Sequence, residues 1–121
     1  MTAAAIVGLG LLGGIGAVLR FLVDGAVAGR AGRDFPVGTL VVNVIGSLIL
    51  GVLAGVALSA DGYRVTATGL LGSFTTFSTW AFESHRLGED GQLGRAALNF
   101  VVSLVLGVTA AWAGRQFGGA L

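Results

Sequence analysis

Charged residues divide this sequence into four long uncharged runs. They cover residues 1–19, 35–60, 65–82 and 96–114, and they contain 19, 26, 18 and 19 residues. A helix needs about 20 apolar residues to cross about 30 Å of hydrocarbon, so each run is long enough for one membrane span. The sequence therefore predicts an all-α integral membrane protein with a single domain over residues 1–121. Its four transmembrane helices are expected over residues 3–28, 37–59, 65–85 and 94–116.

The composition agrees with a membrane protein and excludes several function classes. The chain is 55% hydrophobic and 11% charged, whereas a soluble domain is nearer a quarter charged. The seven basic residues are all Arg and form no run that could follow a phosphate backbone, so no nucleic acid partner is expected. The chain has no Cys and one His, and it shows no nucleophile paired with a base and no nucleotide motif. We therefore do not expect an enzyme.

The Arg residues indicate orientation only weakly. With four spans, one side of the membrane carries Arg64 and Arg115, and the other carries Arg30, Arg33, Arg86 and Arg95. Basic residues in short loops favour the cytoplasmic side. The count fits one fixed orientation, and it fits equally well insertion in both orientations followed by antiparallel pairing of two copies.

Polar residues inside the second and fourth runs recur every four positions. Thr39, Asn43 and Ser47 form one stripe, and Asn99 and Ser103 form another. One interpretation is hydrogen bonding between helices, which the spacing alone favours. The other is a polar track, because uncharged amides and hydroxyls can replace the water of an anion and still release it.

The third run is a poor candidate for one continuous helix. It contains Gly69 and Gly72, followed by a segment rich in Thr and aromatic residues, and both Gly and Thr have low helix propensity. We expect a break between residues 72 and 76. Irregular backbone at membrane depth is tolerated only where it is buried or lines a cavity, and there its carbonyls can bind a cation.

Two aromatic residues of the third run and two charged residues that border the runs are further candidate site residues. Phe77 and Trp80 are three positions apart, so both rings project to one side, where a ring edge can contact a small anion or simply pack. Arg20 and Glu83 are expected near water at helix ends, because a charge at the bilayer centre costs about 2.5 to 3.5 kcal/mol. Arg20 either attracts anions or anchors its helix at the interface. A metal or acid–base site at Glu83 and His85 has little support.

Four motifs occur in order along nearly the whole chain. They are Gly13-Gly14-Ile15-Gly16-Ala17 with Arg20; Pro36 and Gly38-Thr39-Leu40 with Asn43 and Gly46; Gly72 with Thr75-Thr76-Phe77-Ser78-Thr79 and Glu83; and Asn99, Ser103 and Gly107. Together they resemble the Fluc/CrcB family of fluoride channels. The resemblance implies passive export of cytoplasmic fluoride across the cell (inner or plasma) membrane of a prokaryote. It further implies an antiparallel, dual-topology homodimer with two pores at the subunit interface.

The resemblance also implies roles for individual residues. A central structural sodium ion (Na+) would be held by the backbone carbonyls of Gly72 and Thr75 at the paired breaks. The fluoride pore would be contacted by the remaining residues: Asn43 as a donor, Phe77 through its ring edge, Thr39, Thr79 and Ser103 along a polar track, Arg20 in a vestibule, and Glu83 near the pore.

Trp80 departs from the family pattern, in which the second pore aromatic is usually Phe. Trp keeps an electropositive ring edge and adds an N–H donor, so we retain Trp80 as a site residue. The substitution leaves open a heterodimer with a companion subunit.

Two other functions stay open from the residues alone. A proton-coupled transporter of the small multidrug-resistance type is also built from short four-helix chains, but it needs an acid within the membrane, and the first run has none. A membrane assembly protein without transport would use the polar stripes only for helix packing. Composition and spacing do not point to fluoride, which enters only through the resemblance.

Overall fold

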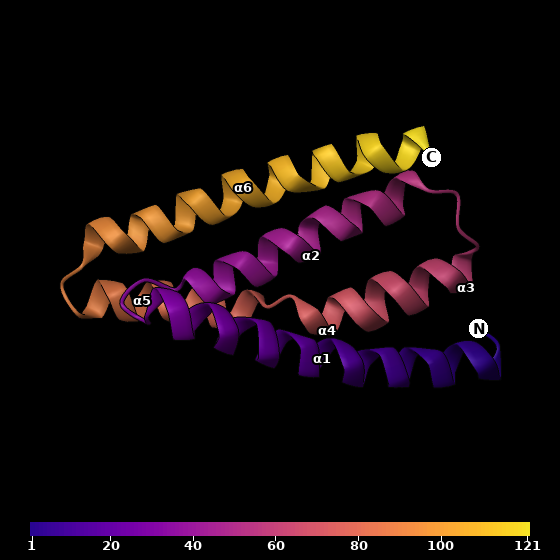
Figure 1. The fold of residues 1–121 in the computed structure, drawn as a ribbon, viewed down its shortest axis with the longest axis horizontal. Coiled ribbons are helices and arrows are strands. Elements are labelled where there is room, and N and C mark those ends of the chain that lie inside the picture. Colours follow the sequence, from indigo (N-terminus) through magenta and orange to yellow (C-terminus); the bar gives the residue numbers. More distant parts are fainter.

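The computed structural model describes residues 1–121, and the chain is helical with no strand. In chain order the elements are α1 (Ala3–Ala31), α2 (Val37–Gly55), α3 (Ala60–Tyr63), η1 (Arg64–Leu71), α4 (Gly72–Phe74), α5 (Phe77–Glu89) and α6 (Leu93–Ala120). They form an elongated bundle in which both chain ends lie at the same end as α3 (Figure 1).

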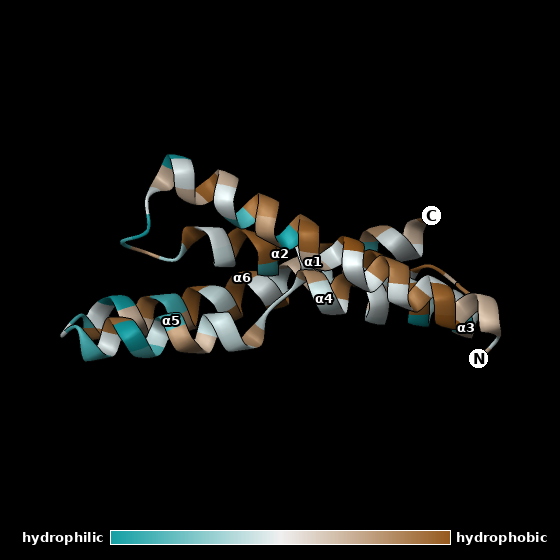
Figure 2. Cartoon of the chain, turned by 90° about the horizontal axis from the view of Figure 1, so that it is seen from below, coloured by the Kyte–Doolittle hydropathy of each residue, from teal (hydrophilic) through white to brown (hydrophobic).

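Helices α1, α2 and α6 are built to cross a membrane. They contain 29, 19 and 28 residues, and each is apolar enough for a membrane span. Large apolar side chains on them are open to the surroundings, such as Phe21, 77% exposed, and Val108, 70% exposed. Such a surface is stable in contact with lipid, whereas its exposure to water is unfavourable. Hydrophilic residues gather on α5 and at the loops at that end of the bundle (Figure 2). The predicted all-α, multi-pass membrane protein is thus confirmed.

Glycines bring α2 and α6 into backbone contact. A Cβ atom at Gly51 would collide with the carbonyl of Ala111, and one at Gly114 would collide with a carbonyl of α2. One turn further along, Gly55 and Gly118 are equally close to the opposite backbone. Each helix thus carries two glycines four residues apart, the spacing that lets membrane helices approach closely.

The chain between α2 and α6 forms two helical segments separated by two residues. Elements α3, η1 and α4 follow one another without interruption. Element η1 is a π-helix, and at its end the N–H of Gly72 donates to the carbonyl of Ala67, five residues earlier. Thr75 and Thr76 then have extended backbone, with ψ angles of 159° and 119°, and helix α5 begins immediately after them.

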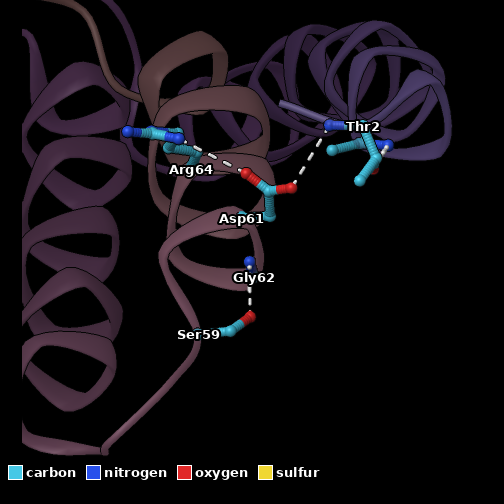
Figure 3. A network of polar contacts seen from close by, with 6 residues as sticks. Thr2, Ser59, Asp61, Gly62 and Arg64 are labelled. Carbon is cyan, nitrogen blue, oxygen red and sulfur yellow. Dashed lines mark hydrogen bonds and ion pairs between the residues drawn. The ribbon is translucent and has the colours of Figure 1, made fainter.

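A small polar network ties the start of α3 to the start of α1 (Figure 3). The hydroxyl of Ser59 accepts the N–H of Gly62 at 3.0 Å. The carboxylate of Asp61 pairs with Arg64 at 3.3 Å and accepts the N–H of Thr2 at 3.4 Å. Because these groups are exposed or half-buried, the network adds little stability.

Several helix ends differ from those predicted. Helix α2 ends at Gly55 rather than at residue 59, because the following residues are extended and lead to Ser59, which caps α3. Residues 60–63, which lie between the predicted second and third spans, are helical after Ser59. Helix α5 continues past residue 85 to Glu89, which pairs with His85 one turn earlier at 2.8 Å. Helices α1 and α6 continue past residues 28 and 116.

Candidate functional site

A side chain of α2 holds the interruption between α4 and α5. Nδ2 of Asn43 donates to the carbonyl oxygen of Thr76 at 2.9 Å, and Oδ1 of Asn43 accepts the N–H of Thr76 at 2.8 Å. Because a backbone N–H only donates and a carbonyl only accepts, the two bonds fix the orientation of the amide. In a continuous helix the N–H of Thr76 would donate to the carbonyl of Gly72. Asn43 replaces that bond.

Thr76 also starts helix α5. Its hydroxyl accepts the N–H of Thr79 at 3.1 Å, as expected of an N-cap residue, and it donates to the hydroxyl of Thr79 at 3.1 Å. Thr76 is buried. The sequence reasoning placed Thr76 inside the expected break but gave it no role. The sequence signal for this N-cap is a Thr that follows two glycines and stands three residues before a second Thr.

Thr75 ends the first helical segment. Its N–H and its hydroxyl both donate to the carbonyl of Leu71, each at 2.9 Å. Its methyl group lies against Gly46 of α2, where a Cβ atom would collide with it. Gly46 therefore lets α2 come close enough for Asn43 to reach the interruption.

A groove of about 470 Å³ runs along the chain at the interruption. Six of the ten predicted site residues line it: Asn43, Gly72, Thr75, Phe77, Trp80 and Ser103. Its remaining lining is mostly apolar and small. Its residues come from α2, η1, α4, α5 and α6 together with the two linking threonines, so the fold brings together positions up to 68 residues apart (Asn43 to Ala111).

A second, smaller hollow of about 150 Å³ is also lined by Thr76. It holds three more predicted residues, Arg20, Thr39 and Thr79, and also Asp24. Thr76 lines both the groove and the hollow, so the two spaces meet at this residue. Asp24 is not among the residues predicted from the sequence.

The tenth predicted residue, Glu83, is linked to the second hollow through Thr39. The hydroxyl of Thr39 donates to Oε1 of Glu83 at 2.5 Å, joining α2 to α5. Thr39 is buried and Glu83 is half-buried. A hydrogen bond to an ionised group is among the stronger ones in proteins, so this contact fixes where the carboxylate lies.

The two aromatic residues of α5 differ in exposure. Phe77 is 75% exposed, and Trp80 is only 8% exposed. The ring of Phe77 meets that of Trp80 edge to face, with centroids 5.4 Å apart, and Trp80 stacks on Phe100 of α6 at 5.0 Å. The indole N–H donates to the carbonyl oxygen of Asn99 at 3.4 Å. The indole N–H, which Phe would lack, therefore forms a hydrogen bond to α6.

The polar stripe of α6 is used mainly for packing. The side chain of Asn99 is almost completely buried, and its Nδ2 donates to the hydroxyl of Ser84 on α5 at 2.8 Å. The hydroxyl of Ser103 donates to Oδ1 of Asn99 at 3.4 Å, and Ser103 also lines the groove. The same stripe thus holds α5 against α6 and presents one hydroxyl to the open space.

These features define a small all-helical protein that crosses a membrane several times and gathers uncharged polar side chains around an interrupted helix. Residues 7–115 match the family described as "CrcB-like protein, Camphor Resistance (CrcB)", and the chain belongs to this family. The resemblance carried by the four sequence motifs is confirmed.

Curated relatives match over almost their whole length. A protein of Mycolicibacterium paratuberculosis named "Fluoride-specific ion channel FluC 2" is 56% identical over 95% of this chain and 94% of its own. A protein of the same name from Mycobacterium tuberculosis is 54% identical over 95% of this chain and 91% of its own. "Fluoride-specific ion channel FluC" of Geobacter sulfurreducens is 42% identical over 90% of this chain and 92% of its own.

Proposed function

We propose that this chain is the subunit of a fluoride-selective channel that lets cytoplasmic fluoride leave the cell passively. The family and the names of relatives up to 56% identical support this function. The observation that carries it in the structure is the position of Asn43, whose amide lies at the wall of the groove while it holds the interruption.

Asn43 retains a donor for an anion. An amide nitrogen carries two hydrogens, and in Asn43 one of them donates to Thr76. The other is free for fluoride, which is small and strongly hydrated and must exchange water for protein donors. Thr79 adds a second uncharged donor, because its hydroxyl accepts from Thr76 and keeps its own hydrogen. Thr39 and Ser103 also line the path, but their hydroxyls donate to Glu83 and Asn99. Uncharged donors bind an anion without trapping it.

Aromatic ring edges add weaker positive charge along the same path. Phe77 lines the groove and is the most exposed aromatic residue of α5. Its contact with Trp80 fixes the orientation of its ring, and the hydrogens at a ring edge carry partial positive charge. Trp80 packs against Phe77 and also lines the groove.

The proposed channel is an antiparallel dimer of four-span subunits. We count α1, α2 and α6 as three spans and the interrupted segment from α3 to α5 as the fourth. Both chain ends lie at one end of the bundle (Figure 1), as an even number of spans requires. One chain leaves its groove open on one side, and a second copy would close it. Chemical cross-linking or native mass measurement of the purified chain should give a dimer, and a monomer would instead indicate a companion subunit.

We further propose that the carbonyls of Gly72 and Thr75 hold a structural sodium ion. Both residues line the groove at a helix end, where carbonyls lose their helical partners. The groove lining contains no carboxylate or imidazole, so a cation there must rely on backbone and hydroxyl oxygens, which suit Na+. One chain offers too few ligands, and the partner's copy would complete the set. When bound, the ion supplies a fixed positive charge. Replacing Na+ by a large organic cation should lower the melting temperature.

Growth of bacteria tests the transport function in cells. A bacterial strain without its own fluoride channel should regain growth in fluoride medium when it expresses this chain. The Asn43→Asp variant at equal expression should not restore growth. Failure of the parent chain to restore growth, despite its presence in the membrane, would contradict the proposal.

A further inference from the structure

Asp24 is a charged residue that the proposed pore leaves without a role. It lies in the last turns of α1, where its carboxylate and its backbone carbonyl lie against Gly38 of α2, so that a Cβ atom at Gly38 would collide with Oδ1 and approach the carbonyl to 3.0 Å. Its side chain is 36% exposed, and Oδ2 lies 3.8 Å from the guanidinium of Arg33. The close packing on glycine fixes the carboxylate at the junction of α1 and α2.

This carboxylate faces two adjoining spaces. One is the 150 Å³ hollow, which it shares with Arg20. The other is a small hollow of about 60 Å³ whose other charged residues are Arg33, Glu83 and Arg86. Asp24 lines both spaces, so its charge acts on an anion that approaches Thr39 and Thr79 from this end.

Arg20 is the other charged residue that lines the first hollow. The two residues are four positions apart on α1 and therefore lie on the same helix face. Arg20 forms no ion pair within 4.0 Å, so its positive charge is available to attract anions. A carboxylate in the same hollow lowers the positive potential that Arg20 creates.

On the basis of the function proposed above, we propose that Asp24 sets the rate at which fluoride enters the pore, by opposing the attraction of Arg20. Arg33 weakens this opposition because it pairs with Asp24 from outside the first hollow. The Asp24–Arg33 pair is too exposed to contribute much to folding. The two charges can therefore change the rate of fluoride entry without affecting how the helices pack.

Fluoride efflux at two ionic strengths tests this role. The full chain and its variants are reconstituted into phosphatidylcholine vesicles, which carry no net charge, and fluoride loss is followed with a fluoride electrode. Exposed charges act over about 30 Å at 0.01 M salt but only about 10 Å at 0.1 M. One series therefore contains potassium fluoride and sucrose, and the other contains added potassium gluconate.

The variant Asp24→Asn should lose fluoride at least about twofold faster than the parent at low ionic strength, with a much smaller difference at high ionic strength. Asp24→Glu keeps the charge and should match the parent. Arg33→Gln should slow efflux at low salt, and it tests the same charge relationship if Asp24→Asn does not fold. Glu89→Gln, which lies outside both hollows, should have no effect.

Three outcomes would overturn the inference. The first is efflux from Asp24→Asn that does not exceed that of the parent. The second is an increase in efflux that is equal at both ionic strengths. The third is the same increase in Asp24→Glu. The last two results would assign Asp24 a packing role. A parent chain that releases no fluoride would instead remove the proposed function itself, and with it this inference.

Discussion

Asn43 provides Thr76 with both of its backbone hydrogen bonds: its amide donates to the carbonyl at 2.9 Å and accepts the N–H at 2.8 Å. A buried backbone group without a partner costs about 1 to 3 kcal/mol. One side chain on α2 thus stabilises an interruption that would otherwise be unfavourable within a membrane. The position of α5, and of every polar group that follows the interruption, depends on this contact.

Replacing Asn43 by Asp should abolish most of the fluoride flux. The carboxylate can still accept the N–H of Thr76, but it places a negative oxygen against the carbonyl and removes the donor proposed for fluoride. The loss of one hydrogen bond of about 1 to 3 kcal/mol corresponds to a drop in rate of about 5-fold to 150-fold. Fluoride efflux from vesicles measures the effect.

Ser47→Ala is the matched control for Asn43→Asp. Ser47 lies one turn further along the same stripe and also lines the groove, but its side chain forms no hydrogen bond. Its replacement should leave efflux within about twofold of the parent, since no hydrogen bond is lost. Equal losses in the two variants would show that the contact between Asn43 and Thr76 has no special role.

Removing the hydroxyl of Thr39 should release the carboxylate of Glu83. Thr39→Val keeps the shape of the side chain and deletes a hydrogen bond to a charged group, a loss of about 1.5 to 3 kcal/mol. We expect a lower melting temperature and slower efflux. Thr39→Ser restores the donor and should recover most of both properties. If Val and Ser variants behave alike, the hydroxyl is not what positions Glu83.

Trp80 should tolerate Phe but not Ala. Phe can stack on Phe100 and meet Phe77 as the indole does, and it loses only the 3.4 Å hydrogen bond to Asn99. A long bond of this kind contributes about 1 kcal/mol or less. Trp80→Phe should therefore conduct at a rate close to that of the parent. Trp80→Ala removes the support beneath Phe77 and should lose both stability and flux; unchanged flux in the Ala variant would exclude Trp80 from the pore.

Two glycines of α6 differ in how closely they approach α2. A Cβ atom at Gly114 would collide with the backbone of α2, whereas one at Gly107 would lie 3.7 Å from the hydroxyl of Ser47. Gly114→Ala should destabilise the protein by about 1 to 3 kcal/mol through overpacking, and Gly107→Ala should not. Thermal melting in detergent compares the two variants. Similar melting temperatures would indicate that α2 and α6 move apart easily.

The long helices and the polar positions could be predicted from the sequence because they depend on local patterns. The length of the uncharged runs predicts the helices. The separation of four residues between Thr39 and Asn43 places both on one face of α2. The spacing could not show which groups these side chains bind, because their partners lie 44 and 33 residues away in the chain. Only tertiary packing assigns the amide of Asn43 to Thr76.

The exact form of the third segment also depended on packing. The break was expected between residues 72 and 76; within that range the helix continues through Phe74, and only Thr75 and Thr76 are extended. Side-chain bonds from Thr75 to Leu71 and from Asn43 to the backbone determine where it stops. The π-helix that precedes it has no signal in the sequence pattern.

Anion efflux from vesicles that contain this chain alone is the most direct test of the account. Fluoride and chloride loss are compared with ion-selective electrodes, for the parent chain and for Asn43→Asp. The account predicts fast fluoride loss and negligible chloride loss from the parent, and little loss of either ion from the variant. Equal loss of fluoride and chloride, or no fluoride loss from folded dimers of the parent, would contradict it.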